Sequence, residues 1–284
     1  MLNKMASTFK TARIRKVGFF DNRGFGVMEF IVALLLAGIV TSGAFALYLT
    51  QNKQWGVQDQ VTDMQSSLRA AAAELTAKIR MAGYKVPDNI PPILAYNTNP
   101  DTIVIIYDSE DLRDVQLEHE MPSPSVELRC DGHDLTGLHD GDWAFIYDPN
   151  TRSGEFFLVT QIQYSDHIQH NTMPLSKAYP VGSKVYKLNR FKYYIDRTNL
   201  AHPNMMMQCW GWPAQVYAEN ITNLNFMYVL SSGTVVDVPN VAYMVREVRF
   251  NVDARSDKPD NEFQIPYRSR SLSSKVNVRN LSVN

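Results

Sequence analysis

The sequence has few cysteines and almost no net charge, and each shortage excludes a class of protein. Its 284 residues include only two cysteines, which excludes a disulfide-dense mini-domain and a four-thiolate zinc or iron–sulfur site. The 28 basic and 29 acidic residues give a formal net charge of −1, so the chain is not a bulk binder of polyanions. A hydrophobic content of 45% is nevertheless typical of a folded chain, and this length can bury one sizeable core and a second small one.

Sequence signatures of catalysis are missing as well. The chain has no G-x-S-x-G, phosphate-binding loop, H-E-x-x-H or dinucleotide fingerprint. We therefore predict that the protein is not an enzyme and needs no cofactor.

Charge is also missing from one long stretch near the front of the chain. The twenty residues from Phe30 to Leu49 carry no charged side chain. At about 1.5 Å per residue, a helix of this length spans about 30 Å, the thickness of the hydrocarbon core of a bilayer. Residues 1–24 carry six positive charges and one negative charge, which predicts a cytoplasmic N-terminus and export of the rest. We interpret the stretch as a membrane helix rather than as a buried core helix.

Glu29 does not fit a simple membrane anchor. It lies at the apolar edge of this stretch, four residues after Phe25. A carboxylate at bilayer depth costs about 2–4 kcal/mol unless it finds a partner. A chain cut just before Phe25 would provide that partner, because the freed α-amine is cationic and lies one helical turn away or on a neighbouring subunit.

The residues around Glu29 form a short motif. It reads Gly24-Phe25-Gly26-Val27-Met28-Glu29, follows Arg23, and resembles the prepilin cleavage motif of type IV pilins and pseudopilins. In that family a prepilin peptidase cuts after the glycine and N-methylates the next residue. The resemblance implies that residues 1–24 are a leader, that Phe25 becomes the N-methylated N-terminus, and that Glu29 guides packing into a filament. Two departures are Gly-Val-Met where Thr-Leu-Ile or Ser-Leu-Ile is commoner, and a leader that is long.

The pattern beyond the apolar stretch predicts that the same helix continues. No proline occurs between Phe25 and Val86. Apolar residues then recur at steps of three or four, which places a stripe on one face of a helix. The stripe consists of Val61, Met64, Leu68, Ala71, Leu75 and Ile79. We predict one helix from Phe25 to Ala82, with residues 25–49 in the membrane or a filament core and residues 50–82 amphipathic and packed on the head.

Residues 83–284 are predicted to form a β-rich head. A long helix followed by strands indicates an α+β protein with antiparallel sheet. Residues 89–100 are expected to form a loop, and Ser231-Ser232-Gly233 a hairpin turn. The expected strands are Thr102–Tyr107, Trp143–Tyr147, Glu155–Gln163, Lys184–Leu188, Phe191–Ile195, Ile221–Leu230, Val235–Val238, Val248–Arg255 and Val276–Arg279.

Short sequence patches across most of the chain resemble one particular family within the type IV pilins. They are similar to the PilW family of minor type IV pilins, and they comprise Gln58-Asp59, Arg80–Tyr84, Tyr193–Asp196, Ala218–Leu224, Val245–Val248, Ala254-Arg255 and Val278–Leu281. This resemblance implies a pilin-like head and a place in the priming or tip complex of pilus assembly. The implied partners are other minor pilins, the major pilin, prepilin peptidase and the inner membrane, with the head in the periplasm and later on the pilus. The related J-type pseudopilin of type II secretion shares this architecture but is usually shorter.

Two rival hypotheses stay open. The first segment can instead be an ordinary signal or anchor of a binding module, with a signal-peptidase cut after Ser42-Gly43-Ala44. An adhesin or DNA-binding tip is also compatible with a pilin architecture. The chain from Phe25 onward has a net charge of −6, however, which disfavours capture of nucleic acid through bulk charge.

The exported part carries two cysteines, Cys130 and Cys209. A disulfide between them can persist in an oxidising compartment, and closing a loop of about 80 residues would stabilise the head by about 4 kcal/mol. Two separate buried thiols are the alternative, because pairing requires a distance that the sequence does not contain.

Two clusters of acidic residues and histidines are candidate metal sites, and a structural role is favoured for both. The cluster of Asp131, Asp134, Asp140 and Asp142 lacks EF-hand spacing, so we favour turns over a calcium loop. Asp166, His167 and His170 lie in an expected loop with no further ligand evident, so we favour solvated polar residues and predict no metal.

Two more groups of residues have a structural and a functional interpretation. Met205, Met206 and Met207, close to Trp210 and Trp212, can form an adhesive surface or cover the helix stripe, and we favour the second. The last segment carries a basic group, which we assign to strand positions that face water. This group is Arg268, Arg270, Lys275 and Arg279.

Overall fold

The computed structural model describes residues 26–260 and 266–281. Its single long helix, α1, runs from Val27 to Met81 without a break at Gly56, which confirms the predicted helix to within two residues at its start and one at its end. The helix ends where Gly83 adopts a φ of +79°. The chain forms two units, residues 1–56 and residues 57–284, so α1 contributes to both.

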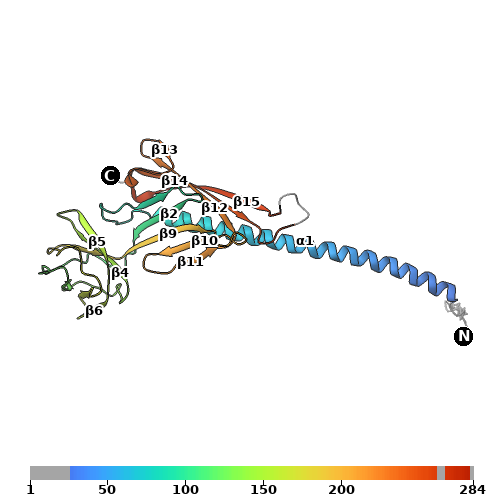
Figure 1. Ribbon diagram of the computed structural model, residues 1–284, viewed down its shortest axis with the longest axis horizontal. Helices are drawn as coiled ribbons and strands as arrows, with labels where there is room; N and C mark the ends of the chain where they lie inside the picture. Colours follow the sequence, from blue (N-terminus) through green and yellow to red (C-terminus); the bar gives the residue numbers. More distant parts are fainter. Residues whose placement is uncertain (1–25, 261–265, 282–284) are drawn as a thin grey trace, which may run out of the picture. The chain divides into compact units, whose positions relative to one another are not determined.

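The unit of residues 57–284 contains antiparallel sheets, which confirms the α+β class (Figure 1). A five-stranded sheet has the order β1-β2-β9-β10-β11, and a four-stranded sheet has the order β13-β12-β14-β15. The strands of the first are β1 (Ile93–Tyr96), β2 (Thr102–Asp108), β9 (Leu188–Asp196), β10 (Asn204–Cys209) and β11 (Gln215–Ala218). Those of the second are β12 (Ile221–Leu230), β13 (Val235–Val236), β14 (Val245–Arg255) and β15 (Ser269–Asn277).

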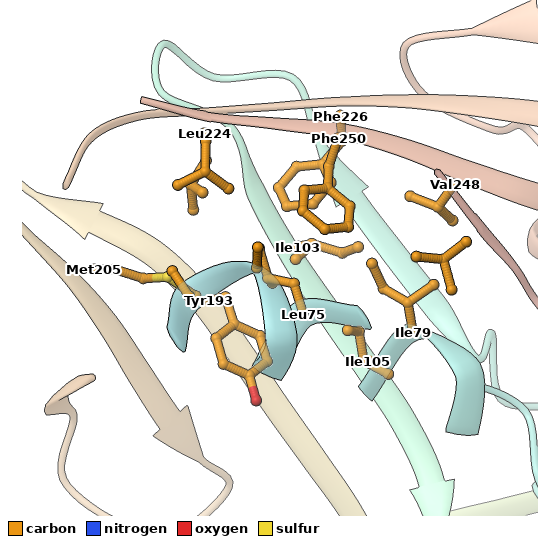
Figure 2. Close-up of a cluster of buried hydrophobic side chains, with 14 of the residues drawn as sticks. Leu75, Ile79, Ile103, Ile105, Tyr193, Met205, Leu224, Phe226, Val248 and Phe250 are labelled. Atoms are coloured by element: carbon orange, nitrogen blue, oxygen red, sulfur yellow. The ribbon is translucent and has the colours of Figure 1, made fainter. Parts of the chain in front are cut away.

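The second half of α1 provides the centre of the main core. Met64, Leu68, Ala71, Leu75 and Ile79 are each no more than 5% exposed, and Val61 is partly buried against them, which confirms the predicted stripe. Side chains from both large sheets surround them (Figure 2). These include Ile103 and Ile105 of β2, Tyr193 of β9, Met205 of β10, Leu224 and Phe226 of β12, and Val248 and Phe250 of β14.

A second hydrophobic core is formed almost entirely by the residues that follow β2, from Ser109 to Ser183. We call residues 109–183 the satellite lobe. Its three-stranded sheet has the order β3-β7-β6, and a second sheet has the order β5-β4-β8, in which β4 pairs with both neighbours and β8 directly follows the lobe in sequence. The strands are β3 (Leu128–Arg129), β4 (Trp143–Asp148), β5 (Ser153–Leu158), β6 (Gln161–Gln163), β7 (His167–Gln169) and β8 (Lys184–Tyr186). Leu128, Ile146, Phe157 and Ile168 belong to its buried cluster.

Strand β2 is buried on both faces. Ile103 and Ile105 belong to the main core, whereas Val104 and Ile106 belong to a smaller cluster with Phe145 and other side chains of β4. This double burial explains why β2 is a continuous apolar run rather than an alternating one. Strand β14 differs from β2, because its residues alternate between buried and more exposed positions.

Several strand predictions were wrong in detail. Strand β1 lies within residues 89–100, and β7 lies where a loop was expected. The predicted strand 155–163 is two strands, β5 and β6, and the last predicted strand gives way to a 3-10 turn at Arg279–Leu281. Strands β3, β10 and β11 were not predicted. These strands have two to six residues, and their stability comes from partners distant in sequence rather than from a local pattern.

Candidate membrane and assembly segment

The first half of α1 exposes an apolar surface. Its most apolar 18-residue window has a mean hydropathy of 2.4, and none of that window is buried. Large side chains such as Leu36, Ile39 and Val40 are each at least 59% exposed. A helix with these properties is long and apolar enough to cross a membrane.

The polar side chains within this apolar half bond to their own helix. Thr41 Oγ1 donates to the carbonyl of Ala37 at 2.7 Å, and Ser42 Oγ donates to the carbonyl of Ile39 at 2.8 Å. Thr50 Oγ1 likewise donates to the carbonyl of Ala46 at 2.9 Å. Hydroxyl groups satisfied in this way need no water, so they are compatible with a hydrocarbon environment.

Glu29 lies in the first turn of α1. Its carboxylate accepts a hydrogen bond from the backbone N–H of Gly26 at 3.0 Å, so the side chain reaches back toward the start of the helix. A carboxylate at this end complements the helix dipole and one of the unpaired backbone N–H groups. The two predicted cleavage residues, Gly24 and Phe25, lie outside the described residues.

Two glycines of the apolar half have no steric partner among the described residues. A Cβ atom added at Gly38 or Gly43 would meet no described atom within 4 Å other than the neighbouring backbone of α1. Their small size is therefore not required by packing inside this chain. Alanines recur in the same half of the helix, and together these small residues leave room for another helix to approach closely.

Polar contacts join the second half of α1 to the five-stranded sheet. The buried Tyr193 hydroxyl donates to Glu74 Oε1 at 2.6 Å. Lys78 Nζ donates to the Tyr107 hydroxyl at 2.8 Å and lies 4.1 Å from the centre of the Phe191 ring. Burial, together with the bond to Glu74, raises the pKa of Tyr193 far above its usual value, so the phenol stays a donor.

We expect Glu74→Ala to destabilise the head by about 1–3 kcal/mol, because it leaves the buried Tyr193 hydroxyl without an acceptor. Tyr193→Phe removes the hydroxyl itself, so adding Glu74→Ala to it should cost less than Glu74→Ala costs alone. Urea unfolding of the two single variants and the double variant measures this coupling. Strictly additive free energies would contradict the contact.

Both cysteines are free thiols in the structure, and the candidate disulfide between them is not formed. Cys130 is buried in the core of the satellite lobe, whereas Cys209 ends strand β10 of the five-stranded sheet. The alternative of two separate buried thiols is therefore confirmed in part, because the thiols are separate but only Cys130 is buried and Cys209 is half-buried. Burial raises the pKa of the Cys130 thiol to about 12, and the neighbouring carboxylates add to this, so Cys130 is a protonated core residue.

The aspartates near residue 140 form turns, as favoured from the sequence. Asp134 accepts from the backbone N–H of Thr136, and Asp140 accepts from that of Ile162. Asp142 caps the N–H of His139 and pairs with Lys187 Nζ at 2.8 Å. Each of these three carboxylates thus accepts from a backbone N–H, and Asp142 also pairs with a lysine.

The two histidines of the expected loop have different environments. His170 is 2% exposed, and its ring nitrogens lie 3.2 Å and 2.8 Å from the carbonyl oxygens of Met173 and Val126, so it is a core residue whose ring N–H has a backbone acceptor. His167 begins β7 and lies beside Asp131 and Asp166. Sequence reasoning missed Asp131 as a member of this group because the pairing of β3 with β7 brings it there.

The methionine strand covers the helix stripe, as favoured. Met205 is fully buried in the main core and Met207 packs against it, whereas Trp212 is 60% exposed. Trp210 packs edge-on against Trp143, and Gly211, with a φ of +80°, has no room for a Cβ atom beside Trp143. The interpretation as a purely adhesive surface is therefore wrong for Met205 and Met207.

The basic group near the C-terminus lies on and beside strand β15. Arg270 and Lys275 are exposed strand residues, as predicted. Arg268 pairs with Asp260 at 3.1 Å. The assignment to strand positions is therefore confirmed for Arg270 and Lys275 only, because Arg268 precedes β15 and Arg279 lies in the 3-10 turn Arg279–Leu281.

No model of a known protein family matches the chain, and no curated protein matches it either. The fold and the apolar segment define an α+β protein with one N-terminal helix of membrane-spanning length.

Proposed function

We propose that the chain is a minor type IV pilin, similar to the PilW family, that acts in the priming or tip complex of pilus assembly. The observation that carries the proposal is the division of α1. One continuous helix exposes apolar side chains in its first half and supplies the core of an α+β head with its second half. A protein that is stored in a membrane and then packs helix against helix in a filament requires this division.

In the proposed mechanism, the protein acts by packing its helix against other helices and catalyses no reaction. Prepilin peptidase cuts after Gly24, and Phe25 becomes the N-methylated N-terminus. The apolar half of α1 then exchanges lipid for neighbouring helices, which approach closely at the small residues around Gly38 and Gly43. Glu29 is neutralised by the α-amine of a subunit. Its orientation toward Gly26, at 3.0 Å from the backbone nitrogen, supports this pairing because it directs the carboxylate to the helix start.

The same features support the proposed location. The leader is cytoplasmic, the apolar half of α1 spans the inner membrane once, and the head lies in the periplasm before incorporation into the pilus. A minor pseudopilin of type II secretion is the nearest alternative, since it would use the same helix in the same way. A tethered binding or adhesion module is the other alternative.

We expect the mature chain to begin with N-methyl-Phe25. Mass spectrometry of the N-terminal peptide of the native protein measures this directly. Gly24→Val provides the control, because it should leave the leader attached while the head remains unchanged. A mature N-terminus near residue 45 would instead indicate a signal peptide, and an uncut chain would indicate a plain anchor. Either result would contradict the proposal.

A further inference from the structure

The satellite lobe brings two carboxylates and an imidazole together. Strand β3 pairs with β7 so that Arg129 lies opposite His167. The next residue along, Cys130, donates its backbone N–H to the carbonyl of Asp166 at 3.0 Å. These two backbone contacts hold Asp131, which follows Cys130, beside Asp166 and His167. The position of all three side chains is thus set by paired backbone rather than by free loops.

One atom of each side chain converges on a common point. His167 Nε2 lies 3.2 Å from Asp131 Oδ1 and 3.7 Å from Asp166 Oδ1. The candidate ligand atoms of the three residues all lie within 4.8 Å of one another. Zinc bonds to imidazole nitrogen and carboxylate oxygen are about 2.1 Å long, so two ligands of a tetrahedral zinc are about 3.4 Å apart. The two measured distances lie on either side of this value.

The remaining polar atoms of the three side chains each lie within 3.4 Å of another polar group. Glu127 Oε1 lies 3.1 Å from the other ring nitrogen of His167. Asp131 Oδ2 pairs with Arg129 Nη2 and with His119 Nε2, each at 2.9 Å. Asp166 Oδ2 accepts from the backbone N–H of Gly132 at 3.4 Å. In metal sites the ligand side chains are typically held by hydrogen bonds to the atoms that do not bind the metal. A carboxylate beside the second ring nitrogen of a histidine is the commonest example.

Two buried atoms of this group lack a satisfactory hydrogen bond. Asp131 Oδ1 and His167 Nδ1 are inaccessible to solvent, and no well-aligned hydrogen bond reaches either within the described part of the chain. The His167 side chain is only 13% exposed. Leaving a buried polar atom unpaired costs about 1–3 kcal/mol. A cation bound by Asp131 Oδ1 would satisfy that oxygen, and a bound ion is one of the causes that leave such an atom without a protein partner.

The charge of the lobe favours a cation. Residues 109–183 contain thirteen acidic and four basic residues, a net charge of −9 in a chain whose total is −1. Close to His167, the carboxylates of Glu127, Asp131 and Asp166 face the single guanidinium of Arg129. A surface of one sign raises the local concentration of the opposite ion. One imidazole with two carboxylates suits zinc, whereas calcium prefers six to eight oxygen ligands.

We propose that Asp131, Asp166 and His167 bind a zinc ion, with water in the remaining position. The metal joins the loop after β3 to the start of β7, and so it stabilises the satellite lobe. The alternative is a protonated His167 that forms ion pairs with the same carboxylates and binds no metal. This inference is independent of the function proposed above, since N-terminal processing and assembly do not enter its test.

Competition with a chromophoric zinc chelator tests the site. The full chain is purified in detergent without a polyhistidine tag, stripped of metal and titrated with zinc chloride. We expect one zinc per chain, and at least a tenfold weaker affinity in His167→Gln and in Asp131→Asn. His202→Gln is the matched control, because His202 also pairs with an aspartate, Asp257 at 2.8 Å, but lies outside this group. It should bind zinc as the unmodified chain does.

Thermal unfolding provides a second measurement. Zinc should raise the midpoint of the unmodified chain and of His202→Gln but not that of His167→Gln. If circular dichroism shows that His167→Gln does not fold, Asp166→Asn takes its place. Failure of the folded chain to compete with the chelator would overturn the proposal and support the protonated histidine. Equal affinity in the folded site variants, or tighter binding of calcium than of zinc, would overturn it as well.

Discussion

Replacing Glu29 with alanine is expected to leave the head folded and to remove most of the protein from the pilus. Glu29 belongs to the unit of residues 1–56, and its carboxylate bonds to the backbone of Gly26, so the core of the head does not depend on it. In a filament the carboxylate would pair with an α-amine in apolar surroundings. Loss of a pair worth about 3 kcal/mol corresponds to a fall of more than a hundredfold in the equilibrium for incorporation. Immunoblots of sheared pili against membrane fractions measure this.

Glu29→Gln separates the charge from the helix cap. Glutamine keeps an oxygen that can accept from the Gly26 N–H, but it carries no charge. If pairing with the α-amine drives incorporation, Glu29→Gln should fail as severely as Glu29→Ala. Recovery of assembly in Glu29→Gln would assign the residue to helix capping alone. Unchanged amounts of both variants in sheared pili would contradict the role of Glu29 in assembly.

Replacing Leu75 with alanine is expected to cause the largest loss of stability in the head. Leu75 is 0% exposed and lies among side chains of α1 and both large sheets (Figure 2). Removing its isobutyl group leaves a cavity in a close-packed core, which costs about 3–4 kcal/mol. For a unit of this size we expect a fall of about 10 °C in the unfolding midpoint. Near-ultraviolet circular dichroism of the full chain in detergent measures the transition.

Leu200→Ala is the matched control for this experiment. Leu200 is 73% exposed, so the same chemical change there should alter the free energy of unfolding by no more than about 0.5 kcal/mol. Similar midpoints for Leu75→Ala and Leu200→Ala would show that the second half of α1 is not part of the folded core.

The helix and its stripe were predictable because their signal is local. Residues such as Met64, Leu68 and Leu75 repeat at the period of a helix, and each is buried as this period requires. Longer strands were predictable for the same reason, and β12 begins and ends at the predicted residues, Ile221 and Leu230. Strand β1 was not predictable, because its four residues are too few to show the alternation of a strand and are held by pairing with β2.

The candidate sites divide in the same way. The Asp134 turn was predictable from composition, since this side chain bonds to the backbone two residues on, whereas the bond of Asp140 to Ile162, 22 residues away, was not. Whether the two cysteines pair was not predictable, because this depends on the folded distance between the core of the satellite lobe, which holds Cys130, and the end of β10, which holds Cys209. Whether the Met205 side chain points into the core was also not predictable, because it depends on which face of β10 packs against the helix.

The sequence alone determined the apolar stretch, the Glu29 motif, the continuous helix and the α+β class, because each follows from the order of neighbouring residues. Only the tertiary structure decided that Asp131 and Asp166, about 35 residues apart, meet at His167. The physical reason is that β3 and β7 pair through backbone groups, which every residue possesses, so their register leaves little trace in the side chains. Packing between the strands of the satellite lobe selects that register, and with it the residues that converge.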